Sequence, residues 1–420
     1  MTPVRIELRR GPGLWSLPVL VVIGVFAARA QLDTDTIWSY ATGAATSAPM
    51  LMAPLAVGLA AWAGGRSQRR GASQAWLLAG RDPAHAPLVE AGVLVACAVV
   101  AYALVATATL LPTAVAATWG GPFWWWLASA GVGFAAAVAA AYGVGVLVPG
   151  RLIPFATALV TYLATTWNLG QIGTWHAMFP VTIEMILPFN APHTQTMRGQ
   201  LLWFAGLGLL ALALVAVKVR SSARLVIPAV GLSLALAVGG AAVVIGENGR
   251  YVDLNRHITW SCSGSSPQVC IHPAFADSLA PISQRAQAIS QRLASTPFAI
   301  TRVEQRPRGV GSLPTPGAIA YAIDAPADDD YDRAGFDIAI AALGVRSCGR
   351  GPLRDTDAHA MAQLLVAWVV GDERWFVPRG PEQQQAKARF LNLPLAGQQQ
   401  WLTTHADAVR TCSLTPQSFT

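Results

Sequence analysis

Charged residues are scarce in this 420-residue chain: Asp, Glu, Lys and Arg make up 12% of it, against about 25% in a soluble globular domain. Hydrophobic residues, in contrast, make up 53% of the sequence. This composition excludes a purely soluble globule. We expect several membrane spans followed by a more polar region.

The sequence also lacks the short motifs that mark common nucleotide and hydrolase sites. It contains no G-x-x-x-x-G-K-[ST] phosphate loop, and neither of its two lysines, Lys218 and Lys387, follows a glycine. It has no H-E-x-x-H zinc motif and no G-x-S-x-G nucleophile elbow. We therefore expect no ATPase, protease or hydrolase activity, no metal and no cofactor in this chain.

The formal net charge of +7 belongs entirely to the apolar part of the chain. Residues 1–246 hold 13 Lys and Arg against 6 Asp and Glu, whereas residues 247–420 hold 16 basic and 16 acidic residues. A nucleic-acid-binding protein carries its basic patch on a soluble domain. We therefore expect no nucleic-acid partner.

Seven apolar stretches of residues 1–246 are candidates for transmembrane helices. They cover residues 14–30, 49–65, 87–111, 123–148, 152–167, 201–217 and 225–246. About 20 residues are needed to cross the ~30 Å hydrocarbon layer, so the first and fifth stretches are at the short end of the range. Each span must be a helix, because hydrocarbon offers no hydrogen bonds to the backbone.

The positions of Lys and Arg predict which way these spans run. Eleven of the 13 basic residues before residue 247 fall in alternate loops, which the positive-inside rule assigns to the cytoplasm. Seven spans from a cytoplasmic N-terminus place residues 247–420 outside the cell membrane. The triplet Ala28-Arg29-Ala30 also resembles a signal-peptide cleavage site. Cleavage there would leave the later topology unchanged.

Four of the five cysteines lie in the predicted external segment, at Cys262, Cys270, Cys348 and Cys412. Thiols outside the cell oxidise, and we expect the disulfides Cys262–Cys270 and Cys348–Cys412. The alternative is a metal site built from the first two cysteines and His272. The spacing Cys-x7-Cys differs from that of zinc knuckles, which favours the disulfides.

Residues 247–420 are numerous enough for a hydrophobic core of their own. Periodicity and turn signals predict a helix over 279–293 and strands within 298–306 and 317–324. They also predict a helix that ends near residue 370 and two further helices, near 381–391 and near 396–410. The sequence therefore predicts a polytopic helical membrane protein followed by a small extracytoplasmic α+β domain.

Two polar features of the external segment resemble ligand sites without matching them. Asp328, Asp330 and Asp332 alternate as in a calcium loop, but an EF-hand would have Gly at position 333 and Glu at position 339. We expect a solvated acidic loop there. We expect His272 to be a turn histidine packed on Trp260.

Trp175 and Glu184 lie in an aromatic, proline-containing stretch between the fifth and sixth spans. Such a stretch can re-enter the bilayer where protein shields it, and a carboxylate in it could meet a cationic substrate. The alternative is an interfacial Glu184 exposed to water near Arg198. Glu90, at the start of the third span, is expected to pair with Arg81.

The predicted cytoplasmic segment 66–86 starts with basic residues and continues as a short amphipathic helix. An exposed ridge of Trp76, Leu77 and Leu78 suits a groove on a partner protein. The alternative is an interfacial helix that lies against lipid. The residues alone favour neither.

The basic stretch RIELRRGPGLWSLPVL, the basic cytoplasmic helix after the second span and the aromatic segment after the fifth resemble actinobacterial permease subunits of the ABC-2 type. The resemblance covers about residues 1–220 and rests on layout. In that family a six-helix domain pairs with a separately encoded ATPase, which docks on the short cytoplasmic helix.

The resemblance implies an exporter permease whose ATPase contacts are Trp76, Leu77, Leu78 and Arg81. ATP and Mg²⁺ would bind only to the partner ATPase, and a homodimer or a paired permease would form the pathway. The seventh span and the external domain depart from the basic family pattern. A membrane-anchored sensor or assembly protein, whose external domain binds a ligand or partner, is the main alternative. An enzyme with an external active site is a third.

Overall fold

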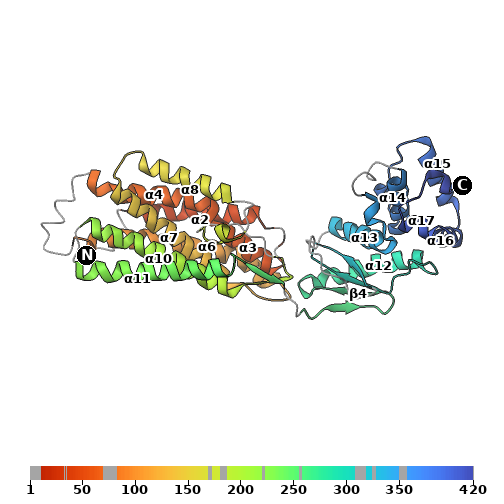
Figure 1. Ribbon diagram of the computed structural model, residues 1–420, viewed down its shortest axis with the longest axis horizontal. Helices are drawn as coiled ribbons and strands as arrows, with labels where there is room; N and C mark the ends of the chain where they lie inside the picture. Colours follow the sequence, from red (N-terminus) through yellow and green to blue (C-terminus); the bar gives the residue numbers. More distant parts are fainter. Residues whose placement is uncertain are drawn as a thin grey trace. The chain divides into compact units, whose positions relative to one another are not determined.

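The computed structural model describes residues 11–32, 34, 36–69, 83–168, 173–179, 187–219, 223–254, 258–307, 318–323, 328–349 and 357–419. The chain divides into two compact units, Met1–Arg256 and His257–Thr420 (Figure 1).

The first unit is a bundle of helices. These are α2 (Pro12–Ala30), α3 (Trp38–Ser47), α4 (Pro49–Arg69), α6 (His85–Ala116), α7 (Trp124–Leu147), α8 (Ile153–Asn168), α9 (Thr174–Ala177), α10 (Thr194–Lys218) and α11 (Ala223–Gly246). In the described part of the chain, six helical segments are long and apolar enough to cross a membrane: α2, α3–α4, α6, α7, α10 and α11. This is the composition of a helical membrane protein.

Helix α8 has only 16 residues, about 24 Å of helix, but it carries the chain from one end of the bundle to the other. Near the starts of α7 and α10, Ser129 donates a hydrogen bond to Gln200. Farther along the same two helices, Gly143 faces Ala211. The two helices therefore run in the same direction, so the chain must return between them. Helix α8, which packs along α4, makes that return (Figure 1).

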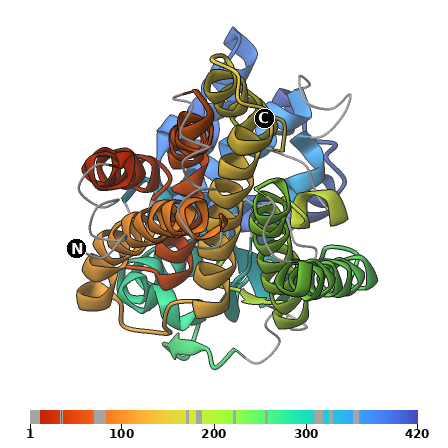
Figure 2. The same ribbon diagram turned by 90° about the vertical axis from the view of Figure 1, so that its left-hand side faces the viewer.

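Close helix contacts at glycine hold the bundle together. A Cβ atom on Gly64 of α4 would lie 2.3 Å from the Tyr142 carbonyl oxygen of α7, and one on Gly145 would lie 2.1 Å from the Ala61 carbonyl oxygen. Only glycine lets the two backbones approach this closely. Gly206 and α11 meet in the same way, and Figure 2, which looks roughly along the helices, shows α10 and α11 (green) as a pair.

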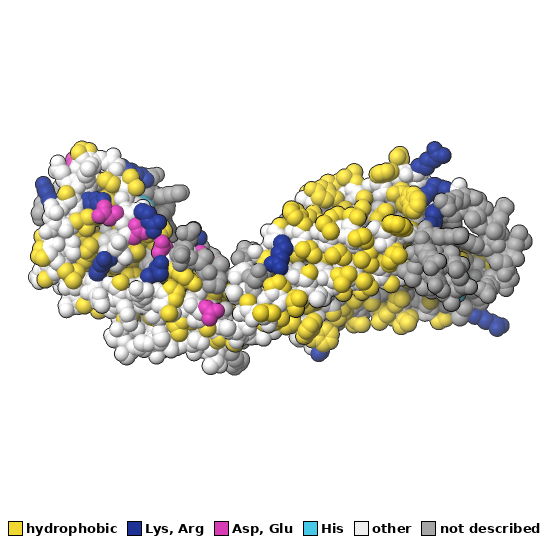
Figure 3. Space-filling view, turned by 180° about the vertical axis from the view of Figure 1, so that it is seen from behind, with side chains coloured by type: hydrophobic (Ala, Val, Ile, Leu, Met, Phe, Trp, Pro, Cys, Tyr) yellow, Lys and Arg dark blue, Asp and Glu magenta, His cyan; other side chains and the backbone are white. Residues whose placement is uncertain are grey.

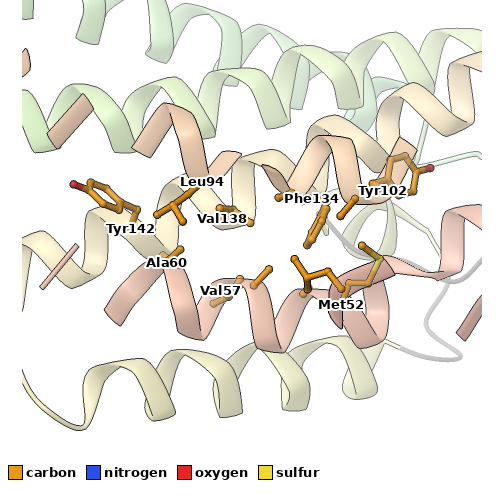
Figure 4. Close-up of a cluster of buried hydrophobic side chains, with 14 of the residues drawn as sticks. Met52, Val57, Ala60, Leu94, Tyr102, Phe134, Val138 and Tyr142 are labelled. Carbon is orange, nitrogen blue, oxygen red and sulfur yellow. The ribbon is translucent and has the colours of Figure 1, made fainter. Parts of the chain in front are cut away.

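The apolar core of the first unit lies between α4, α6 and α7. Figure 4 shows its labelled members: Met52, Val57 and Ala60 on α4, Leu94 and Tyr102 on α6, and Phe134, Val138 and Tyr142 on α7. The outside of the unit is also apolar. Trp15, Phe155 and Trp167 are 78%, 74% and 80% exposed, and hydrophobic side chains cover much of the face in Figure 3. Lipid is the solvent that suits such a surface.

The second unit contains a four-stranded sheet in the order β3-β4-β5-β6. Its strands are β3 (Ser261–Ser263), β4 (Gln268–Ile271), β5 (Arg302–Gln305) and β6 (Ala318–Tyr321). Strands β3 and β4 are antiparallel, whereas β4, β5 and β6 are parallel. A separate two-stranded sheet, β1 (Asn190–Pro192) with β2 (Val252–Leu254), belongs to the first unit.

Helices pack on this sheet and beside it. They are α12 (Leu279–Leu293), α13 (Asp328–Leu343), α14 (Asp357–Val370), α15 (Pro381–Asn392), α16 (Leu395–Thr404) and α17 (Ala406–Arg410), with 3-10 turns η1 (Pro273–Ser278), η2 (Val345–Gly349), η4 (Glu373–Trp375) and η5 (Pro416–Phe419). Helix α12 contacts β4 and α13 contacts β6. The predicted helix over 279–293 is confirmed as α12, with Ile282, Ala286, Ile289 and Leu293 buried.

The prediction of a solvated acidic loop is wrong for the described part of that run. Residues from Asp328 onward form α13, because acidic residues in a first turn interact favourably with the helix dipole. The Asp332 carboxylate also accepts a hydrogen bond of 2.7 Å from Arg285 of α12. This ion pair ties the acidic turn to the neighbouring helix.

The glycine contacts between α4 and α7 predict a specific sensitivity. We expect Gly145→Ala to lower the free energy of unfolding by about 1–3 kcal/mol, because its Cβ has no room. Gly239→Ala is the matched control, since nothing lies within 4 Å of a Cβ at Gly239. Thermal melting of the full-length protein in detergent measures both. A Gly145→Ala variant as stable as the control would contradict the close approach.

Candidate functional site

A charged cluster lies among the membrane helices at the end of the bundle where α4 stops and α6 begins. Arg66 of α4 donates to Glu90 Oε1 of α6 at 2.7 Å, and Tyr142 of α7 donates to Glu90 Oε2 at 3.1 Å. Glu90 is 7% exposed and Tyr142 is 1% exposed. One carboxylate therefore joins three helices.

The surroundings explain why Glu90 needs both donors. A carboxylate among apolar helices is costly unless it is paired and hydrogen-bonded. Arg66 follows Gly64 by two residues, and the Tyr142 carbonyl is the atom that Gly64 faces. The cluster and the close crossing of α4 and α7 thus share Tyr142. Ionisable groups buried in this way mark functional sites in membrane proteins.

The expected partner of Glu90 was Arg81, which lies outside the described residues. Among the described residues the carboxylate pairs with Arg66; the contact with Arg81 stays a prediction. Arg66 is far from Glu90 in sequence, but it lies in the last turns of α4, which packs beside α6. Spacing along the chain could not reveal this contact, because it depends on how the two helices cross.

Most of the other predicted site residues of the first unit also lie outside the described residues: Trp76, Leu77, Leu78 and Glu184. What the structure does describe is both flanks of the 70–82 segment, the end of α4 and the start of α6. Trp175 lies in α9 and is 84% exposed. That position suits an indole ring at a membrane interface.

Two apolar grooves lie along α6, one beside its start and one farther along it. The larger, about 860 Å³, runs between α6 and α7 and includes Val99, Ala106 and Gly131. The smaller, about 560 Å³, lies between the start of α6 and the helices α10 and α11. No Asp, Glu, Lys or Arg is among the described residues that line either groove. Apolar groups are the chemistry that such walls accept.

Both expected disulfides are present in the second unit. Cys262–Cys270 joins β3 to β4, and Cys348–Cys412 joins η2 to the segment after α17. The alternative metal site loses its thiols to the first bond. Among the described residues, no group of three or more His, Cys, Asp or Glu side chains could hold a metal ion.

His272 is wholly buried next to the Cys262–Cys270 bond. Its Nδ1 accepts the Ala274 N–H at 3.1 Å, and its ring packs edge-on against Phe275. Burial lowers the pKa of His272 from 6.5 to about 4, because a charged imidazole would lose its hydration. The side chain therefore caps η1 as a neutral group.

The Glu90 cluster predicts a strong effect of removing one charge. Glu90→Gln leaves Arg66 without its carboxylate, and we expect it to lower the free energy of unfolding by about 3 kcal/mol. The double variant Arg66→Gln with Glu90→Gln should recover part of this loss. Melting curves of the full-length protein in detergent test both. Equal stability of Glu90→Gln and the parent would contradict a buried pair.

The buried His272 predicts that the second unit loses stability in acid. Its folded-state pKa of about 4 lies below the ordinary 6.5, so only the unfolded state binds a proton between these values. Stability is then highest above pH 6.5 and falls by about 3 kcal/mol as the pH drops to about 4. Hydrogen exchange of the β4 amides in the full-length protein measures this. His272→Gln should flatten the profile and His405→Gln should not; an unchanged slope in His272→Gln would contradict the assignment.

No protein-family model, curated protein or solved structure matches this chain. Its function is therefore to be inferred from the membrane helices, the Arg66–Glu90–Tyr142 cluster and the disulfide-bonded second unit.

Proposed function

We propose that the chain is the permease subunit of an ABC-type exporter, driven by a separate ATPase that docks on residues 66–86. The observation that carries this proposal is the ion pair between Arg66 and Glu90, 2.7 Å apart. It joins the two helices that flank the docking segment. The resemblance in layout to ABC-2 permeases is the reason for proposing an ATPase as the partner.

The ion pair gives a docked ATPase a direct connection to the bundle. Arg66 is in the last turns of α4 and Glu90 is in the second turn of α6. A force that the ATPase exerts on the segment between these two residues moves α4 and α6 together. Tyr142 extends the same connection to α7. ATP and Mg²⁺ bind to the partner ATPase, and this chain converts the movement of that subunit into movement of its helices.

The grooves beside α6 support a helix that changes its contacts during transport. Helices α4 and α7 are locked by Gly64 and Gly145, and α10 and α11 are locked by Gly206 and Gly240. Helix α6, in contrast, leaves open space toward α7 and toward α10 and α11. Alternating access then involves α6 moving against the locked pairs. Two copies, or one copy with a paired permease, form the complete pathway.

The orientation that we propose has the basic end of the bundle in the cytoplasm of a cell-membrane protein. Lys and Arg side chains lie toward both ends of the first unit in Figure 3, with Arg66, Arg69, Arg151, Lys218 and Arg224 at the end where α4 stops and Arg29, Arg198 and Arg250 at the other. The positive-inside rule assigns the end with the larger number to the cytoplasm. Seven crossings of the bundle separate the start of α2 from the end of α11. The second unit then lies outside the cell, where its two disulfides are stable.

A second candidate function is a membrane-anchored sensor or assembly protein. It is favoured by the independence of the second unit, which has its own sheet, core and disulfides. In that function the external unit binds a ligand or partner, and the helices serve as anchor and relay.

Purification of the tagged protein from its host, with mass spectrometry of what accompanies it, separates the two functions. We expect a P-loop ATPase in near-stoichiometric amounts with the parent protein. Leu77→Asp should reduce the recovered ATPase at least about tenfold, because a charge in the centre of a docking surface is costly. Val377→Asp, at a side chain that is 75% exposed in the second unit, is the matched control.

Membrane insertion of Leu77→Asp should equal that of the parent. Undiminished co-purification would overturn the docking segment. Absence of any ATPase, with both disulfides formed, would favour the sensor.

A further inference from the structure

A buried polar network closes the end of the bundle opposite Glu90. Gln200 of α10 is its centre. Its Oε1 accepts the Ser129 hydroxyl of α7 at 2.8 Å, and its Nε2 donates to the Ala177 carbonyl of α9 at 2.7 Å and to the Tyr251 hydroxyl at 2.8 Å. The Tyr251 hydroxyl in turn donates to the His176 carbonyl at 3.2 Å. A buried network that is fully bonded in this way is rigid.

Apolar contacts surround the same network. Tyr251 is 5% exposed and stacks on Trp126 of α7, with ring centroids 6.1 Å apart and planes within 11°. Ala177 is wholly buried, and the Trp203 indole of α10 donates to the Met178 carbonyl at 2.9 Å. Helix α9 is therefore held against α10 by two side chains that bond to its last carbonyl groups.

Tyr251 and the three residues of β2 that follow it, together called the exit strand, lead the chain out of the bundle. Tyr251 follows α11 and precedes β2, which pairs with β1, and its own carbonyl accepts the His193 N–H at 2.8 Å. The turn between α11 and Tyr251 packs just as closely. Gly249, with φ of 64°, faces the backbone of Gly173 and Thr174, where a Cβ would lie 2.5 Å away. The exit strand and α9 are thus one packed layer over the starts of α7 and α10.

We propose that Gln200 and Tyr251 form a latch that closes the outer end of the bundle, and that the second unit operates this latch through the exit strand. What the latch controls, release of substrate to the outside, rests on the proposed function. Displacement of the exit strand withdraws the Tyr251 hydroxyl from Gln200 and from the His176 carbonyl. Helix α9 then keeps its contacts to α10 and α11.

The contacts of the exit strand explain why a regulatory unit would follow α11 directly in the chain. The strand that leads to the second unit is not a free linker, since Val252–Leu254 are paired with Asn190–Pro192. A ligand or partner that changes the second unit acts on an exit strand whose Tyr251 already hydrogen-bonds to α9 and α10 and stacks on Trp126 of α7. No additional contact between the units is required.

Cysteine accessibility tests the latch without measuring transport. Ala177→Cys places a reporter thiol in α9 at a wholly buried position, and a membrane-impermeant maleimide labels it in intact cells only when α9 opens. Tyr251→Phe removes one hydroxyl and keeps the ring on Trp126. We expect it to label about twofold to tenfold faster, the equivalent of one buried hydrogen bond. Gln200→Leu breaks three hydrogen bonds and should exceed tenfold.

Tyr102→Phe is the matched control, because its buried hydroxyl bonds to the Leu127 carbonyl at 3.2 Å, outside the latch. It should leave the labelling of Ala177→Cys unchanged. Parent-like labelling rates in both Tyr251→Phe and Gln200→Leu would overturn the latch. A faster rate in Gln200→Leu alone would overturn the role of the exit strand. If Ala177→Cys does not fold, hydrogen exchange of residues 173–179 gives the same comparison.

Trp175→Cys, at an exposed position of α9, separates the latch from the proposed orientation. Prompt labelling in intact cells supports an external α9. Labelling only after permeabilisation overturns the orientation in the proposed function. The comparison of Tyr251→Phe with Tyr102→Phe in permeabilised cells then still decides the latch.

Discussion

The Glu90 carboxylate is the constraint on which the arrangement of the membrane helices depends. A buried charge among apolar helices needs an opposite charge or hydrogen-bond donors beside it. For Glu90, α4 supplies Arg66 and α7 supplies Tyr142. Rotation or sliding of either helix would break its hydrogen bond to the carboxylate. The glycine crossing of the same two helices, next to the cluster, fixes their separation as well.

Close backbone packing at glycines joins two pairs of helices in the bundle. Inside a membrane, lipid is as apolar as the side chains, so helices associate through shape and polar contacts. The pairs α4–α7 and α10–α11 have such contacts at several glycines. Helix α6 packs on α2 and α3 and shares the apolar core with α4 and α7. Two grooves lie along it, so it has open space toward α7 and toward α10 and α11.

Hydropathy, helical periodicity and cysteine count predicted the long apolar helices of the bundle, α12 and both disulfides, because each of these depends on local composition or on few alternatives. They did not predict α3 or α9. The contact of Glu90 with Arg66 could not be predicted, since it is set by a helix crossing. Gln200 is one of two amides in the apolar helix α10, the other being Gln195, and Tyr251 follows the last span. Both features can be read from the sequence, but nothing in the spacing of Gln200 and Tyr251 shows that their side chains form a hydrogen bond.

In the proposed exporter, the proposed latch gives the second unit a role. A permease needs its outer end closed while its inner end responds to the ATPase. The cluster at Glu90 and the network at Gln200 occupy opposite ends of the same bundle, and α7 belongs to both through Tyr142 and Ser129. A movement of α7 that relaxes one polar site must disturb the other, because a helix transmits displacement along its axis. Sensing by the second unit and coupling to an ATPase then become two inputs to one helix rather than competing functions.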